Sequence, residues 1–474
     1  MEAKSKNKII YDPLYGFITL TQIEWEIIHT PFYQRLRWIK QIGFSFYTFP
    51  GAEHSRFGHS IGVMFNAHKI LKSIGKSVSD EDLNDPENHS KEKVRHQSIR
   101  LAALLHDLGT FCFSHTTEMA YVKFGGTTNL KNSKGHPDDH EHLGSFIIKN
   151  TDYAEGITFI LKKFGIKPQV ISDLVKGISP DVLANQILHS EVDCDRMDYL
   201  LRDAHYTGLN YGTYDRDYLL HHFVTVKVAD HDILAIKHNA LHCVEDFLNA
   251  RFAWYSQVVR SSRGAKYDAL AEELTFYLLE KGAIYSYADL LEMVKNDPFM
   301  FFSFNDNYFM TLIHKLHREK FFDKDVRIKD IVECLLFEKS PRTIRCKEFK
   351  QRILNQDESA ENEKFHKRAQ DKVKEIEAVI KKKGGKNDWI VVDIPQKSIV
   401  FTKSKKRIIK DQEFQNILLE RDPTKILTDS GEVQLIVDVE NSIISQVQNS
   451  YNFVPNVFCS ESAHKLLKAE KIIE

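Results

Sequence analysis

The stretch that decides the fold is Ser98-Ile-Arg-Leu-Ala-Ala-Leu-Leu-His-Asp-Leu-Gly109. Its apolar residues recur at three- and four-residue spacing, the pattern of a helix with one buried face: Ile99, Ala102, Leu105 and Leu108. Gly109 is typical of the residue that ends such a helix. The pair His106-Asp107 is therefore expected at a buried helix end, where it offers one nitrogen and one oxygen ligand to a cation.

A histidine–aspartate pair alone is weak evidence for a metal site, and the chain contains a second pair at His231-Asp232. That pair lies between two alternating apolar runs, which predicts a β-hairpin without nearby ligands. The first pair differs because two further potential metal ligands can be identified elsewhere in the chain. His59 lies upstream in Arg56-Phe-Gly-His59, and Asp195 lies downstream in Asp193-Cys-Asp-Arg-Met-Asp-Tyr199.

The order His59, His106-Asp107 and Asp195 resembles the metal-binding set of the HD-domain phosphohydrolases. Residues 32–43, 49–52 and 195–203 are similar to the deoxynucleoside triphosphate triphosphohydrolases of that superfamily, including the catalytic part of the sterile-alpha-motif/HD-domain enzymes. The similarity is dense from Ile9 to Gly212 and sparse afterwards.

The resemblance implies a role for each matching residue. One metal ion is implied at His59, His106, Asp107 and Asp195. Catalytic roles are implied for Arg56, His115 and His140. Substrate contacts are implied for Gln41, Arg196, Tyr199, Asp203 and Arg251, and we add Arg260 as a further charge for phosphate. A nucleotide effector is implied at Lys8, Ile9, Gln34 and Arg37. Asp198 and Arg202, four residues apart, are expected to form a structural ion pair.

The chain departs from these relatives at positions close to catalysis. Thr110 replaces a second histidine, and Val259 and Ser262 replace a tyrosine and a lysine. The guanine-reading members place an aspartate where this chain has His29, and a neutral imidazole cannot accept two hydrogen bonds from a guanine edge. We therefore expect no strict dependence on GTP or dGTP.

Two imidazoles and two carboxylates suit Fe, Mn, Zn, Co or Ni better than Ca or Mg. Mg or Mn is expected to accompany a triphosphate substrate. The residues alone predict metal-assisted hydrolysis of a phosphate ester, and the resemblance implies attack at the α-phosphorus of a deoxynucleoside triphosphate (dNTP). Two alternatives stay open: an HD phosphohydrolase acting on another nucleotide or on single-stranded nucleic acid, and a nucleotide sensor without turnover.

The composition indicates which kinds of partner and which cellular environment the protein is expected to have. A net charge of −1 over 474 residues gives no overall attraction to nucleic acid or to an anionic membrane. Six scattered cysteines, a polar start and the lack of a long apolar run predict a reduced, cytoplasmic protein without a membrane span. The basic run Lys403, Lys405, Lys406 and Arg407 is typical of solvated surface, with a nucleotide or nucleic-acid contact as the alternative.

The predicted fold is mostly α. A helical HD core is expected over residues 1–330, and a smaller mixed α/β C-terminal lobe, regulatory or oligomerising, over residues 331–474. We expect one buried helix over residues 183–204, continuous helical structure over residues 243–279, a surface loop over residues 79–96 and a mobile active-site loop or disorder over residues 125–139. A homo-oligomer, dimer or tetramer, with nucleotide-dependent assembly or activation is expected; the alternative is that the effector residues only shape a permanent subunit interface.

Overall fold

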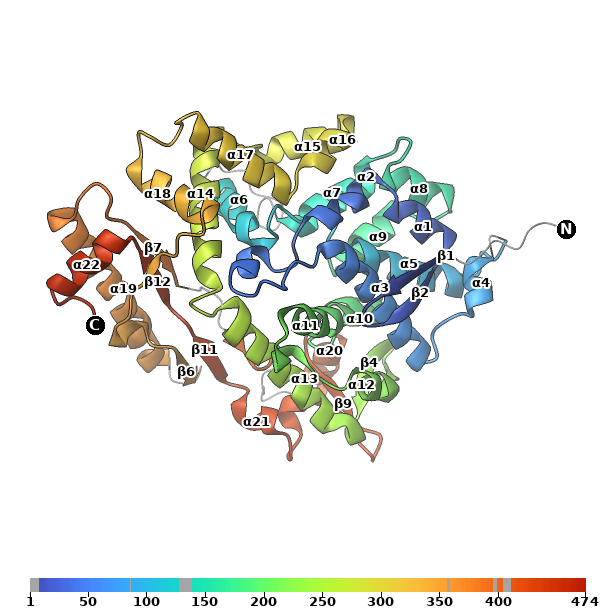
Figure 1. Ribbon diagram of the computed structural model, residues 1–474. Coiled ribbons are helices and arrows are strands. Elements are labelled where there is room, and N and C mark those ends of the chain that lie inside the picture. Colours follow the sequence, from blue (N-terminus) through green and yellow to red (C-terminus); the bar gives the residue numbers. More distant parts are fainter. Residues whose placement is uncertain (1–7, 86, 128–138, 356–358, 395–398, 404–410) are drawn as a thin grey trace.

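Helices make up most of the protein, whose computed structural model describes residues 8–85, 87–127, 139–355, 359–394, 399–403 and 411–474 (Figure 1). The mostly α fold with a mixed α/β C-terminal region is therefore confirmed. The expected loop over residues 125–139 lies largely outside the described residues, as do Lys405, Lys406 and Arg407.

The helices up to residue 207 are α1 (Gln22–Ile28), α2 (Pro31–Gln34), α3 (Arg56–Ser73), α4 (Asp80–Asn84), α5 (Lys91–Leu105), α6 (His115–Thr127), α7 (His140–Asn150), α8 (Ile157–Lys163), α9 (Pro168–Val175), α10 (Val182–His189) and α11 (Cys194–Thr207). α3 packs against both α5 and α11. This packing brings together three segments far apart in the sequence, and each of them carries part of the predicted metal set.

The stretch around His106 folds as its pattern predicts. α5 ends at Leu105, His106 forms its C-terminal cap, and the apolar face is fully buried at Ala102, Leu105 and Leu108. Gly109 follows with Gly144 of α7 against it, so close that a side chain at Gly109 would collide with the α7 backbone. The helix end is therefore fixed by its own packing and by α7.

The chain enters this core through an antiparallel hairpin of β1 (Lys8–Asp12) and β2 (Gly16–Leu20). Thr21 caps α1 through a reciprocal pair of bonds with Glu24. The helical path is interrupted at Thr30-Pro31, where Thr30 caps α2 and Pro31 is its first residue. The 3₁₀ turns η1 (Arg35–Trp38) and η2 (Gly43–Tyr47) then lead to α3.

The second part of the chain is again mainly helical, with α12 (Arg216–His222), α13 (Leu241–Trp254), the π-helical turn η5 (Tyr255–Val259), α14 (Ala265–Glu280), α15 (Tyr287–Asn296), α16 (Pro298–Ser303), α17 (Asp306–Arg318) and α18 (Val326–Leu336). The strands β3 (Phe223–Val228) and β4 (His231–Lys237) form the expected hairpin, and His231-Asp232 opens its second strand. Asp232 pairs there with Lys76 and Lys227, which accounts for this pair without a metal.

The C-terminal part contains α19 (Ser359–Lys383), α20 (Asp411–Leu419), α21 (Ile443–Val447), α22 (Glu461–Ala469), β5 (Arg342–Thr343), β6 (Arg352–Asn355), β7 (Ile390–Asp393), β8 (Ile399–Val400), β9 (Lys425–Leu427), β10 (Val433–Leu435), β11 (Ser450–Phe453) and β12 (Asn456–Cys459). The strand orders are β6-β11-β8, β5-β12-β7 and β10-β9-β4-β3. In the last sheet β9 pairs in parallel with β4, so part of the C-terminal region adds to the helical core. The boundary at residue 330 stays a prediction.

Three local expectations are wrong. The single helix expected over residues 183–204 is two helices. α10 ends at His189, and Asp193 caps the start of α11 by accepting a bond from the Arg196 N–H. The loop over residues 79–96 contains α4 and the start of α5, since Ser79 and Ser90 each cap a helix. The helical run over residues 243–279 is interrupted between η5 and α14.

Candidate active site and metal centre

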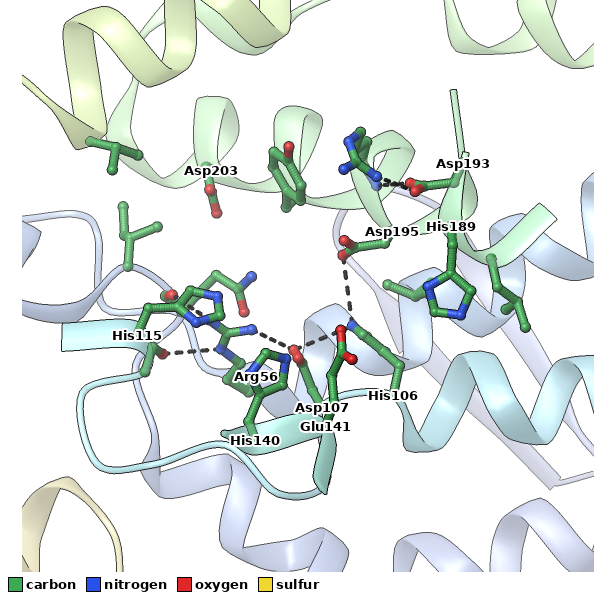
Figure 2. Close-up of a pocket in the computed structure, with 18 of the residues that line it drawn as sticks. Arg56, His106, Asp107, His115, His140, Glu141, His189, Asp193, Asp195 and Asp203 are labelled. Atoms are coloured by element: carbon green, nitrogen blue, oxygen red, sulfur yellow. Dashed lines mark hydrogen bonds and ion pairs between the residues drawn. The ribbon is translucent and has the colours of Figure 1, made fainter. Parts of the chain in front are cut away.

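A pocket of about 390 Å³ opens beside the end of α5, between α3, α6, α7, α11 and a C-terminal segment. Most residues assigned from the sequence line it: Gln41, Arg56, His106, Asp107, His115, His140, Asp195, Arg196, Tyr199 and Asp203. In Figure 2, His115 and His140 lie on one side of His106-Asp107, and His189 and Asp193 lie on the other. His59 lies behind the wall and is almost fully buried.

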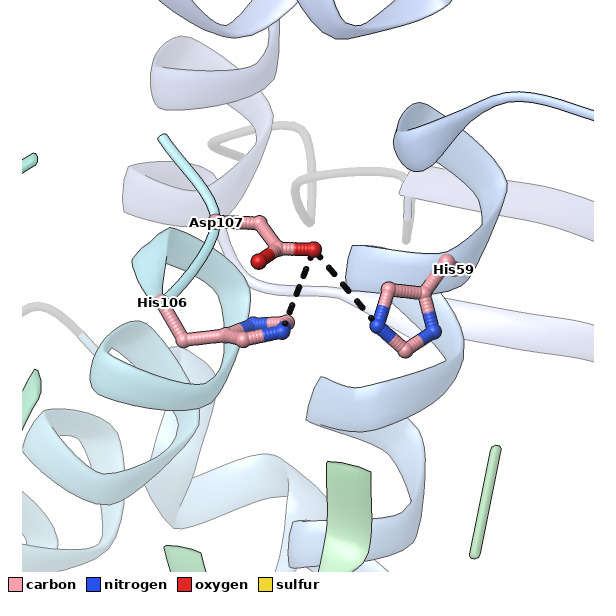
Figure 3. Close-up of side chains that lie close together, drawn as sticks. All are labelled: His59, His106 and Asp107. Carbon is pink, nitrogen blue, oxygen red and sulfur yellow. Dashed lines mark ion pairs between the residues drawn. The ribbon is translucent and has the colours of Figure 1, made fainter. Parts of the chain in front are cut away.

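The four predicted metal ligands converge at the floor of this pocket. Nε2 of His59 lies 3.6 Å from Oδ2 of Asp107, and Nε2 of His106 lies 3.3 Å from the same oxygen (Figure 3). Oδ1 of Asp195 approaches the same two nitrogens, at 3.1 Å from His59 and 3.6 Å from His106. The ligand atoms of His59, His106 and Asp107 all lie within 4.8 Å of one another, a spacing that suits one ion.

Hydrogen bonds at the Nδ1 atoms of His59 and His106 orient both rings so that Nε2 faces the predicted metal position. Nδ1 of His59 donates to Oδ2 of Asp198 at 2.8 Å, and Nδ1 of His106 donates to the Ala103 carbonyl at 2.8 Å. Neither Nε2 atom has a hydrogen-bond partner among the described residues, although both are buried. Oδ1 of Asp195 is close to both Nε2 atoms but does not form a hydrogen bond with either of them. Two imidazole nitrogens and two carboxylates face one another here, and a divalent cation bound by the neutral imidazoles would satisfy all four groups.

The charges of the site also favour a cation. Burial favours the neutral form of Asp107, but the Arg56 guanidinium and the two imidazoles outweigh it and hold the pKa of Asp107 well below its usual range. Burial opposes a charge on His106, yet Asp107 and Asp195 raise its pKa well above the ordinary value. The donor set thus attracts positive charge, and its chemistry fits a borderline divalent metal.

Arg56 is directed at the ligand set. Its Nη1 donates to Oδ2 of Asp107 at 2.6 Å, its Nε to Oγ of Ser114 at 3.0 Å and its Nη2 to the Gln41 carbonyl at 3.3 Å. These bonds orient Asp107 in addition to placing a fixed positive charge at the pocket wall. Thr110, the departure beside the pair, is buried, and its hydroxyl donates to the Asp107 carbonyl at 2.7 Å.

His115 and His140 are joined by a buried carboxylate, Glu118 of α6. The two oxygens of Glu118 accept from Nδ1 of His115 at 2.6 Å and from Nδ1 of His140 at 2.6 Å. Burial opposes a charge on His140, but the Glu118 charge and its hydrogen bond raise the pKa of His140 to about 9. His140 is therefore protonated at neutral pH. It lies next to His115, whose imidazole is exposed to solvent.

Three polar groups at the end of the pocket marked by Asp203 have no partner among the described residues: Oε1 of Gln41, the Tyr199 hydroxyl and Oδ2 of Asp203. The other Asp203 oxygen lies 2.6 Å from Nε2 of His54, and the Tyr199 ring packs on Trp254 with centroids 5.0 Å apart. Buried polar atoms without partners are rare in proteins. This end of the pocket is therefore suited to a polar ligand such as a sugar.

Two of the predicted substrate residues lie elsewhere. Arg251 is absent from the pocket wall, because its Nη2 donates to the Phe401 carbonyl at 2.9 Å and to the Val400 carbonyl at 3.3 Å. Arg260 is absent as well, because its Nη1 is paired with Asp393 at 2.8 Å. Both guanidiniums tie the helical core to the C-terminal region, and the expectation that they face the phosphates is corrected here.

The four predicted effector residues lie outside the pocket, Lys8 and Ile9 in β1, Gln34 at the end of α2 and Arg37 in η1. Lys8 lies over the Trp25 ring, and the Arg37 guanidinium lies 3.5 Å from the Phe57 ring centroid. Gln34 accepts from Nε of Arg37 at 2.8 Å, and Ile9 is 52% exposed. Their effector role stays a prediction.

Sequence reasoning missed three contributors to the site. Glu118 gave no signal except its position three residues after His115, which places it one helical turn away. Asp198 was taken as structural, and it does bind Arg202 at 2.8 Å, but it also orients His59. The C-terminal Arg421 lines the pocket and could not be assigned, because only the return of that segment to the core brings it there.

Comparison with known proteins agrees with this geometry. The family model described as HD domain matches residues 56–203, which begin at Arg56 and end at Asp203. The uncharacterised protein YwfO of Bacillus subtilis is 32% identical over 255 residues, covering 54% of this chain and 52% of that protein. The deoxynucleoside triphosphate triphosphohydrolase SAMHD1 of Mus musculus is 30% identical over 220 residues, covering 43% of this chain and 32% of that protein. The match spans about half the length of the first curated relatives.

Two solved structures share the fold. A phosphohydrolase from Bacteroides thetaiotaomicron has a TM-score of 0.65 at 19% identity, covering 96% of this chain and 100% of that one. A hypothetical protein from Aquifex aeolicus has a TM-score of 0.66 at 22% identity, covering 98% of this chain and 100% of that one. Among the described residues, no helix combines the length and apolar character needed to cross a membrane. Residues 56–203, which contain all four predicted metal ligands, thus match the HD domain.

Proposed function

We propose that the protein is a metal-dependent triphosphohydrolase that converts a dNTP to a deoxynucleoside and tripolyphosphate. The observation that carries the proposal is the convergence of two unpartnered imidazole nitrogens and two carboxylates at the floor of the pocket. The activity named for mouse SAMHD1, which is 30% identical over 220 residues, supports dNTPs as the substrate class.

His59, His106, Asp107 and Asp195 would hold one Fe, Mn, Zn, Co or Ni ion, and Mg or Mn would accompany the triphosphate. When bound, the metal supplies a Lewis acid and lowers the pKa of a bound water from 15.7 to about 7. Arg56 keeps Asp107 oriented and adds a fixed positive charge beside the scissile phosphate. His115 donates or relays a proton to the leaving group, with Glu118 fixing its Nδ1.

At the other end, Tyr199 packs under the sugar while Oε1 of Gln41 and Oδ2 of Asp203 accept hydrogen bonds from it. The Tyr199 ring is fixed against Trp254 and fills the space beside the sugar face. A ring in that position leaves no room for a 2′-hydroxyl, which favours a deoxynucleotide over a ribonucleotide. Arg196 lies on the same wall, bonded to the Ser190 carbonyl at 3.0 Å, and faces the phosphates.

Product analysis tests the proposal. The protein is incubated with each of the four dNTPs and Mn²⁺ or Mg²⁺, and the products are separated by chromatography. Tripolyphosphate and deoxynucleoside are expected from at least one dNTP. Monophosphate and pyrophosphate would identify a different nucleotidase, a reading that the replaced positions Thr110 and Val259 favour as the second candidate. No turnover, with and without nucleotide effectors, would favour a sensor.

The ligand assignment has its own test. Asp195→Ala, and His106→Ala combined with Asp107→Ala, should remove bound transition metal and activity while the fold remains, because the surrounding apolar helices carry the packing. Elemental analysis measures the metal and circular dichroism the fold. For His115→Ala the metal should stay while the rate falls roughly 10²-fold or more, as for loss of a proton donor. Undiminished metal in the first two variants would refute the assignment.

A nucleotide effector at Lys8, Ile9, Gln34 and Arg37 and a cytoplasmic homo-oligomer, dimer or tetramer, complete the proposal. The hairpin presents an exposed apolar surface at Ile9, Tyr11 and Phe17, which suits a subunit interface. Nδ1 of His29 is engaged by the Trp25 carbonyl at 2.7 Å, which supports activation without strict dependence on GTP or dGTP. Sedimentation with and without each nucleotide, paired with activity, tests this; a monomer that is equally active throughout would refute it.

A further inference from the structure

The C-terminal region reaches the pocket and adds charged groups to its wall. Lys403, Arg421 and Asp422 line the pocket together with His189 and Asp193. In Figure 2 these last two residues lie on the side of the metal set away from His115 and His140. Lys403 and Arg421, the cations that this region adds, lie 200 or more positions after the HD domain in the sequence.

A buried carboxylate holds the segment in place. Glu191, which precedes α11, is fully buried, and its oxygens accept from the Thr402 hydroxyl at 2.7 Å, from the Lys403 backbone N–H and from the Thr424 hydroxyl at 3.2 Å. The Glu191 N–H in turn donates to the Asp422 carbonyl at 3.3 Å. Lys403 and Arg421 are thus fixed to the same short connection that carries Asp193 and leads to Asp195.

Core contacts on both flanks support this anchor. Phe401 stacks on Phe252 with ring centroids 3.7 Å apart, and its carbonyl accepts from Arg251. Nε2 of Gln186 in α10 donates to the Leu418 carbonyl at 3.1 Å, and β9 continues the sheet of β4. The segment is therefore built into the core, and the cations that it carries have defined positions.

The charge at this end is not balanced within the protein. Arg196 pairs with Asp193, and Lys403 pairs with Asp422 at 3.1 Å. Arg421 has no ion-pair or hydrogen-bond partner in the described part of the chain. Its guanidinium lies across Gly177, where a side chain would collide with Nη1 of Arg421 and with the His189 ring. An unpaired guanidinium held against a pocket wall is a site for an anion, and its planar fork suits a phosphate.

We propose that Lys403 and Arg421 form a subsite for the terminal phosphates of the substrate, a proposal that rests on the proposed function of the same pocket. The polar groups without partners at the Asp203 end take the nucleoside, and the metal set takes the phosphate that is cleaved. The remaining phosphates extend from the metal set toward His189, where Arg196, Lys403 and Arg421 gather. This subsite supplies the cations that Arg251 and Arg260, engaged elsewhere, do not.

The subsite is tested with two substrates that differ in terminal phosphates. The full-length, metal-loaded protein and the variants Arg421→Ala and Lys403→Met are assayed with a dNTP and with bis(p-nitrophenyl) phosphate, a diester without terminal phosphates. Because a hydrogen bond to a charged group contributes about 1.5–3 kcal/mol, KM for the dNTP should rise roughly 10- to 100-fold in Arg421→Ala, with KM for the diester unchanged. Arg318→Ala, an exposed arginine of α17, serves as control. An equal change for both substrates, or none, would overturn the subsite.

Binding of inorganic tripolyphosphate in excess Mg²⁺, measured by calorimetry, separates this proposal from the function itself. Wild-type protein that turns over no dNTP but binds tripolyphosphate, with affinity lost in Arg421→Ala, would refute the triphosphohydrolase while supporting the subsite. Turnover of a dNTP with tripolyphosphate bound equally well by wild type, Arg421→Ala and Lys403→Met would support the function and overturn the subsite.

Discussion

Asp198→Asn is expected to weaken metal binding although Asp198 is not a metal ligand. The side chain is fully buried, and its two oxygens accept from three donors: Nδ1 of His59 at 2.8 Å, and Nε and Nη2 of Arg202 at 2.8 and 3.0 Å. An asparagine keeps one acceptor. It preserves most bonds when its carbonyl takes the place of Oδ2, which leaves its NH₂ group facing Nη2 of Arg202.

The magnitude follows from this geometry. The bond to His59 survives but changes from charge-assisted to neutral, from about 1.5–3 to about 0.5–1.5 kcal/mol. A loss of about 1–2 kcal/mol lowers metal affinity roughly 5- to 30-fold, in line with the 10- to 100-fold effects of such outer partners. The NH₂ group that faces another donor should also lower the free energy of unfolding by about 1–3 kcal/mol.

Calorimetric titration of Mn²⁺ into metal-stripped protein measures the first effect, and urea unfolding measures the second. Asp217→Asn removes an exposed carboxylate, 86% accessible, and is the matched control. A folded Asp198→Asn variant that binds Mn²⁺ as tightly as the wild type and the control would refute the claim that Asp198 orients His59.

Three further changes are expected. Glu118→Gln should lower the pKa of His140 from about 9 and slow turnover at least about tenfold, because the carboxylate that stabilises its charge is gone; NMR titration of the imidazole together with kinetics checks this, and an unchanged pKa would contradict it. Burial lowers the pKa of His68 to about 2 and that of His96 to about 4, below the ordinary 6.5 of the unfolded chain, so stability should be lost as pH falls below about 6.5. Urea unfolding at pH 7 and 5 should differ by roughly 2 kcal/mol for each imidazole, and His96→Gln should reduce the difference. Arg251→Ala should lower the free energy of unfolding by about 1–3 kcal/mol, since it leaves two partly buried carbonyls without this donor, and unaltered stability would contradict that role.

The parts of the fold that the sequence predicts are those decided by local patterns. The helix ending at His106 has an apolar stripe and a glycine stop, and both signals are local. The break between α10 and α11 was missed because Asp193 can be read as a helix residue or as a cap. The cap prevails here because buried Glu191 is bound by residues more than 200 positions away.

For the site as well, the residues in the well-matched part of the sequence could be predicted, and those that depend on distant contacts could not. The resemblance assigned His59, His106, Asp107 and Asp195 by sequence order, and the structure brings them together. Arg251 was assigned from the resemblance in the region where the similarity is sparse, and Arg260 was added there as a further charge. Their partners Phe401 and Asp393 belong to the C-terminal region. No local pattern predicts such pairs, since they depend on how that region returns to the core.

The central claim is that this pocket directs water to the α-phosphorus of a dNTP. Hydrolysis in oxygen-18 water, followed by mass spectrometry of the products, tests it most directly. The account predicts one oxygen-18 atom in tripolyphosphate and none in the deoxynucleoside, with no incorporation by the combined His106→Ala and Asp107→Ala variant. Label in a nucleoside monophosphate or in the deoxynucleoside, or incorporation that persists in that variant, would contradict it.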